Sequence, residues 1–137
     1  RIFFPELQEI AEVVQDNRGI ACLHSCGNLT ELISPIMDIG FNGLHGLSPS
    51  AGNDLLSIRK QTRGKLCLMG VFQVDCLDYR ELEASKKKIL QLLDSGGGYV
   101  LGSSEGLSKN TPLNSVRTLY EVHKFPAYHN EGSVCAI

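Results

Sequence analysis

The chain has 137 residues, of which 42% are hydrophobic and 20% are charged, the composition of an ordinary globular domain. A formal net charge of -2 excludes the basic surface that nucleic acid or an anionic membrane needs, so we expect small molecules or proteins as partners. The longest apolar runs are far shorter than the roughly 20 residues that cross a bilayer. Five cysteines, an odd number without regular spacing, favour a reducing, cytoplasmic setting.

Helical and strand-like patterns alternate along the chain. The first segment, from Pro5 to Asn17, has apolar residues at helical spacing, and the next, from Gly19 to His24, is the nearly continuous apolar run of a strand buried on both faces. The same reasoning predicts helices over 29–39, 54–62, 79–93 and 112–123, and strands over 41–47, 65–71 and 99–101. The tail over 125–137 has no usable period, and we expect it to be irregular.

Four strands, each followed by a helix, predict an α/β fold with parallel strands and crossover helices. The sheet is either open and doubly wound or part of a (β/α)8 TIM barrel. A complete barrel takes about 250 residues, so residues 1–137 would form a partial barrel domain of four βα units that lacks its N-terminal half. A half barrel has two unpaired edges, and we expect more chain or a partner to cover them.

Ligand sites in parallel α/β folds lie at the carboxyl ends of the strands. His24 and Cys26 stand two residues apart at such an end, so in extended geometry both side chains point the same way and can bind one metal ion. An imidazole and a thiolate together suit zinc. The other reading is a chance pair with Cys26 as a small apolar residue.

Further candidates follow the other strands. Glu105 would point into the same barrel mouth as the pair, although a solvated loop carboxylate is an equal alternative. His45 is either a general base, a second ligand or, more commonly, a structural histidine. Asp54 is expected to cap a helix, whereas Gln73 and Asp75 either cap or contact the ligand.

Five short motifs follow one another along the chain: LHSCGN at 23–28, AGNDL at 51–55, LMG at 68–70, GGYVLG at 97–102 and TPLNSV at 111–116. Their order and spacing resemble the carboxyl-terminal half of the uroporphyrinogen decarboxylase superfamily. The resemblance extends to about residue 124 and implies the TIM-barrel fold. The superfamily also contains zinc-dependent methyltransferases that move a methyl group between a corrinoid protein and a thiol such as coenzyme M.

The His-x-Cys pair distinguishes the methyltransferase branch of this superfamily. The resemblance implies that His24 and Cys26 are zinc ligands and that a third, distal ligand stands where this chain has Glu105 instead of the usual Cys. A carboxylate also binds zinc, so a His, Cys and Glu set is chemically acceptable. An acidic residue common in the family is replaced by Gln73, which indicates altered cofactor or substrate contacts at Gln73 and Asp75.

The resemblance therefore favours a zinc-dependent methyltransferase. Its cofactor would be methylcobalamin, a corrinoid carried by a partner protein. The alternative within the superfamily is decarboxylation of a tetrapyrrole such as uroporphyrinogen, which needs no His-x-Cys pair. A third interpretation is a non-catalytic barrel piece that self-associates through its open edges.

Overall fold

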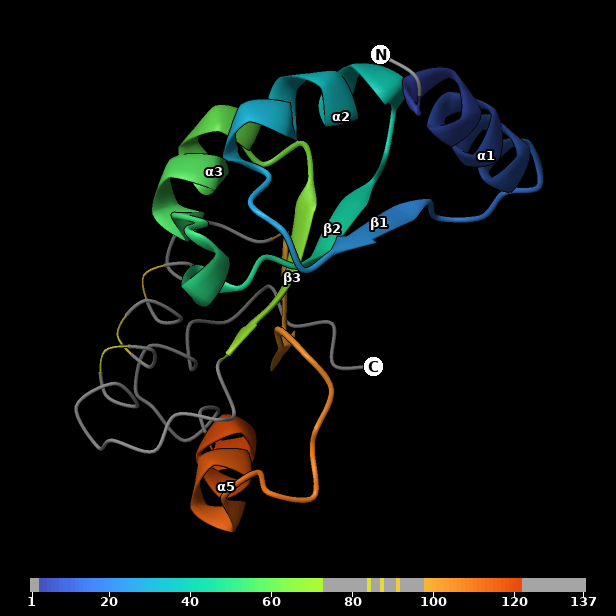
Figure 1. The fold of residues 1–137 in the computed structure, drawn as a ribbon. Helices are drawn as coiled ribbons and strands as arrows, with labels where there is room; N and C mark the ends of the chain where they lie inside the picture. Colours follow the sequence, from blue (N-terminus) through green and yellow to red (C-terminus); the bar gives the residue numbers. More distant parts are fainter. Residues whose placement is uncertain (1–2, 73–83, 85–86, 88–90, 92–97, 122–137) are drawn as a thin grey trace, which may run out of the picture.

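The computed structural model describes residues 3–72, 84, 87, 91 and 98–121. Its strands are β1 (Cys22–Ser25), β2 (Gly43–Gly46), β3 (Cys67–Phe72) and β4 (Tyr99–Ser103), and its helices are α1 (Phe4–Asp16), α2 (Ile33–Ile39), α3 (Leu55–Thr62) and α5 (Leu113–Glu121). Figure 1 shows α1, α2 and α3 as an arc on one side of the sheet. None of the described helices has the length and apolar character that crossing a membrane requires.

The four strands form one parallel sheet in the order β1-β2-β3-β4. A doubly wound sheet reverses its strand order and carries helices on both faces, whereas a barrel wall keeps the chain order and carries its helices outside. The observed order, with α1 to α3 on one side, confirms the α/β fold with parallel βα units and favours the barrel over the open sheet.

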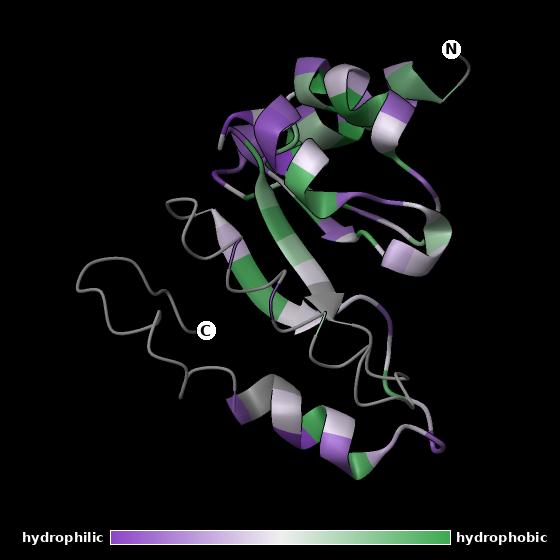
Figure 2. Cartoon of the chain, turned by 90° about the vertical axis from the view of Figure 1, so that its left-hand side faces the viewer, coloured by the Kyte–Doolittle hydropathy of each residue, from purple (hydrophilic) through white to green (hydrophobic). Residues whose placement is uncertain are grey.

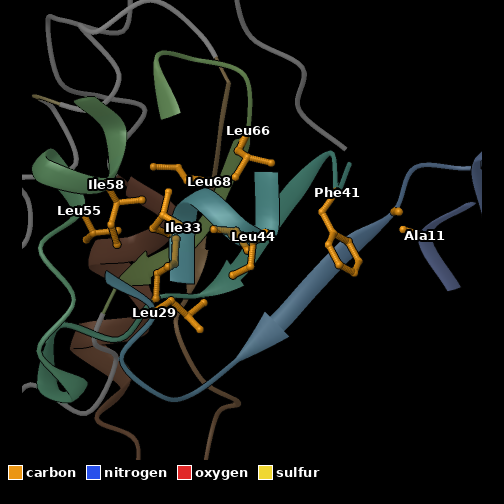
Figure 3. Close-up of a cluster of buried hydrophobic side chains, with 12 residues drawn as sticks. Ala11, Leu29, Ile33, Phe41, Leu44, Leu55, Ile58, Leu66 and Leu68 are labelled. Atoms are coloured by element: carbon orange, nitrogen blue, oxygen red, sulfur yellow. The ribbon is translucent and has the colours of Figure 1, made fainter. Parts of the chain in front are cut away.

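The hydrophobic core lies between the sheet and the arc of helices (Figure 3). Side chains alternate along a strand, so Leu44 of β2 and Leu68 of β3, which are level in the register, both point toward the helices and are completely buried. In Figure 2 the inner sides of these helices and β3 are rich in apolar residues. The core consists of Ala11, Ala21, Leu29, Ile33, Ile36, Phe41, Leu44, Leu47, Leu55, Ile58, Leu66 and Leu68.

The sequence predicted that the strand over 19–24 is buried on both faces, and this prediction is wrong for β1. Cys22 and His24 are exposed and Ile20 is 77% exposed. The strand lies at the edge of the described sheet, and no described segment covers the face opposite the helices. That uncovered face, which we call the open face, carries the candidate site.

Most predicted elements form within a few residues of their expected bounds. The helix expected over 29–39 is divided into a 3₁₀ turn (Thr30–Leu32) and α2, because Pro35 has no backbone N–H and suits only the first turn of an α-helix. Of the helix expected over 79–93 only Ala84, Lys87 and Gln91 are described, and they are helical. The tail over 125–137 lies outside the described residues.

Candidate functional site at the carboxyl ends of β1 and β2

His24 and His45 lie side by side on the open face. The parallel register of β1 and β2 sets them level with each other. Their Nδ1 atoms are 2.8 Å apart, and their ring centroids are 4.8 Å apart with the planes tilted by 35°. This is a hydrogen bond in which one ring N–H donates to the lone pair of the other ring. His45, which is less exposed than His24, is therefore part of the predicted site and not an isolated structural histidine.

Cys26 approaches the other side of the His24 ring. Its Sγ lies 3.4 Å from His24 Nε2, and both side chains are exposed. Tetrahedral zinc holds nitrogen at about 2.0–2.1 Å and sulfur at about 2.3 Å, which puts the two donor atoms about 3.5 Å apart. The observed distance fits two ligands of one zinc ion, and it equally fits a thiol–imidazole hydrogen bond in the metal-free chain.

The three side chains form a line and not a triangle. The two nitrogens of the His24 ring point away from each other, so Cys26 and His45 lie on opposite sides of it. In the described part of the chain, no three His, Cys, Asp or Glu side chains gather where they could hold a metal. Glu105 follows β4 and is exposed, and its role as third ligand stays a prediction. Gln73 and Asp75 lie outside the described residues.

Asn53 joins the loop after β1 to the loop after β2. Its Oδ1 accepts from the Leu29 N–H at 2.9 Å, and its Nδ2 donates to the carbonyl oxygens of Gly27 at 3.0 Å and Ser48 at 3.1 Å. The side chain is buried, so these bonds replace water completely. Sequence reasoning missed this role, although the residue stands in the AGNDL motif. The neighbouring Asp54 caps α3 as predicted, accepting from Leu56 N–H at 3.2 Å.

Gly46 allows β1 and β2 to approach closely beside His24. Its φ of +99° lies in the left-handed region that favours glycine. A Cβ at this position would collide with the Ser25 carbonyl oxygen and would lie 3.4 Å from His24 Cε1. A side chain here would therefore push apart the two strand ends that carry the histidines.

Two more thiols, Cys22 and Cys67, lie on the open face on either side of Gly43. Burial, with a smaller contribution from Cys22, raises the pKa of the Cys67 thiol, and the Arg59 guanidinium offsets part of that rise. The thiolate is the reactive form, so Cys67 is a poor nucleophile. Two strands with a third between them are about 9.6 Å apart, too far for a disulfide between the two residues.

Tyr99 anchors β4 to β3. Its hydroxyl donates to the Gly70 carbonyl oxygen at 2.7 Å, and its ring packs against the core. Burial raises the pKa of the Tyr99 phenol well above its ordinary value. The hydroxyl stays protonated and holds the two strands together near the loop that carries Glu105.

A model of the family described as uroporphyrinogen decarboxylase (URO-D) matches residues 1–125 of the chain. The chain belongs to this family. The uroporphyrinogen decarboxylase family was the one indicated by the sequence motifs, and the match confirms that resemblance. No curated protein matches the chain.

A solved structure named as a methyltransferase from Methanosarcina mazei shares the fold of this family member. The two are 22% identical with a TM-score of 0.67, and the match covers 88% of this chain and 34% of the other. This similarity shows a common fold. The chain spans about a third of the length of that methyltransferase.

Proposed function

We propose that this member of the uroporphyrinogen decarboxylase family is a zinc-dependent methyltransferase that moves a methyl group between a corrinoid protein and a thiol. The observation that carries the proposal is the 3.4 Å distance between His24 Nε2 and Cys26 Sγ at the carboxyl end of β1. The family match and the Methanosarcina methyltransferase of the same fold support it. A decarboxylase has no need of a thiolate at this point of the barrel mouth.

His24 and Cys26 would hold the zinc, His24 as a neutral imidazole and Cys26 as the thiolate that forms when its thiol releases a proton on metal binding. Zinc, when bound, lowers the pKa of a coordinated thiol and supplies it as a thiolate nucleophile. In the overall transfer a sulfur–carbon bond would form as the corrinoid–carbon bond breaks, the electron pair of the broken bond would stay with the corrinoid, and the acceptor thiol would release its proton. The exposure of both side chains leaves room for an acceptor thiol to reach them.

Glu105 is our proposed third ligand, since a carboxylate completes a chemically acceptable His, Cys and Glu set. Such a set is less rich in thiolate than the Cys-containing set of the methyltransferase branch and is therefore more electrophilic. Gln73 and Asp75, in the stretch that follows β3, are proposed to contact the corrinoid or the substrate.

The decisive experiment is metal analysis of the full-length protein and three variants. We expect about one zinc per chain in the unmodified protein and in Cys22→Ser, and strongly reduced zinc in His24→Ala and Cys26→Ala. Cys22→Ser is a matched control, because Cys22 is an exposed thiol on the same strand and the same face. Full zinc content in both His24→Ala and Cys26→Ala would refute the proposal.

The activity after which the family is described is the competing candidate. It is tested by incubating the full-length protein with uroporphyrinogen and measuring the loss of carboxyl groups. We expect no loss. Decarboxylation that persists in the Cys26→Ala variant would favour the decarboxylase over the methyltransferase.

A further inference from the structure

The contact between His24 and His45 adds a residue to the proposed zinc site. Their Nδ1 atoms are 2.8 Å apart, a short hydrogen bond between two rings that the strand register sets side by side. Two unprotonated Nδ1 atoms would repel each other at this distance, so one of the two must carry the proton. Which ring donates decides the chemistry at the far side of His24.

Only one direction of this hydrogen bond leaves His24 able to bind a metal beside Cys26. If the His24 Nδ1–H donates, the Nε2 atom of His24 has a free lone pair, and that atom lies 3.4 Å from Cys26 Sγ. If the His45 Nδ1–H donates, a neutral His24 carries its own proton on Nε2, where it blocks a metal. Metal-binding histidines generally donate their second ring N–H to an acceptor, which fixes the tautomer and the ring orientation.

We propose that His45 is a positioning residue for the zinc site. Its Nδ1 accepts the His24 Nδ1–H and so holds the His24 ring with the Nε2 lone pair directed toward the Cys26 side. The inference rests on the proposed zinc function of His24 and Cys26. His45 does not bind the metal itself, because it lies on the side of the His24 ring opposite to Cys26.

The position of His45 suits this role. It stands in β2 between two buried glycines, Gly43 and Gly46. A Cβ at Gly43 would lie 3.1 Å from Cys22 Sγ and one at Gly46 would lie 3.4 Å from His24 Cε1, so glycine at both positions keeps side-chain atoms away from β1. The left-handed conformation of Gly46 brings the end of β2 close to Ser25, one residue after His24. The backbone of two neighbouring strands thus places the two histidines level with each other, within reach of one hydrogen bond.

The test is the zinc affinity of the full-length protein, measured by competition with a chelator. We expect His45→Phe, which has no acceptor, to bind zinc 10 to 100-fold more weakly than the unmodified protein. His45→Gln, whose side-chain oxygen can accept the same N–H, should retain an affinity within a few-fold of the original. Met69→Leu is the matched control, because Met69 is level with His45 on the neighbouring strand β3. This substitution should leave the zinc affinity unchanged.

Two further readouts separate the possible results. Thermal unfolding of the metal-free variants identifies any loss of affinity that comes from misfolding, and the absorption spectrum of the cobalt-substituted protein reports the ligand geometry in His45→Phe. Unchanged affinity in His45→Phe, with zinc lost in His24→Ala, overturns the role of His45 and leaves the zinc function standing. Equal weakening in His45→Phe and His45→Gln also overturns it. Zinc that is retained in His24→Ala refutes the zinc function itself.

Discussion

The side-chain amide of Asn53 donates to the Gly27 carbonyl oxygen at 3.0 Å and so ties the start of α3 to the residue that follows Cys26. The two residues are 26 positions apart in the chain. Because the same amide also bonds Ser48 and Leu29, the loop that carries Cys26 is held against the rest of the fold by one buried side chain.

Asn53→Ala is expected to lower the free energy of unfolding by about 2–4 kcal/mol, because three backbone groups lose their partner and two of the lost hydrogen bonds are buried. Denaturant unfolding measures this change, with Asn110→Ala, at an exposed position, as the control. The variant should also bind zinc more weakly, since the Cys26 loop is released. A loss of stability below about 0.5 kcal/mol would contradict the role assigned to this side chain.

Gly46→Ala is expected to destabilise the protein by at least about 2 kcal/mol, because the positive φ disfavours a side chain and the added Cβ would collide with the Ser25 carbonyl oxygen. The separation of β1 from β2 should also weaken zinc binding, because it draws His45 away from the His24 ring. Gly106→Ala is the control, since an added Cβ there meets nothing within 4 Å. Equal stability of the two variants, compared by thermal unfolding, would be inconsistent with this account.

Glu105→Ala is expected to weaken zinc binding while leaving the fold intact, because the residue is exposed. Glu105→Cys should instead strengthen binding, since a second thiolate replaces a carboxylate at the third position. Titration with a chromogenic chelator compares the two, and Glu31→Ala, at another exposed position, serves as the control. Identical affinities in both Glu105 variants and the unmodified protein would remove Glu105 from the ligand set.

The buried Tyr99 phenol should make the protein less stable at high pH. Burial raises the pKa of the phenol in the folded state above its unfolded value of about 10, so the stabilisation is complete below pH 10 and is lost as the pH rises above it. Tyr99→Phe should therefore be less stable at pH 8, by about 1 kcal/mol for the lost hydrogen bond, and less sensitive to pH above 10. Parallel stability curves for the two proteins would contradict this prediction.

Local patterns in the sequence were sufficient for the α/β class, the order of the elements, the Asp54 cap and the His24–Cys26 pair. Each depends on residues close together in the chain, such as helical apolar spacing or two positions on one strand. The family could also be predicted, because its motifs are short and contiguous, and the match over 1–125 confirms it.

Only the tertiary structure decided which residues from different strands meet. His45 joins His24 because the register of β1 and β2 sets them level, and Asn53 reaches Gly27 because two loops close on each other. The exposure of Cys22 and His24, against the expected burial, likewise depends on which segments cover a sheet face. A one-residue change of register would turn these side chains to the other face, and apolar patterning in one strand does not determine its alignment with the next.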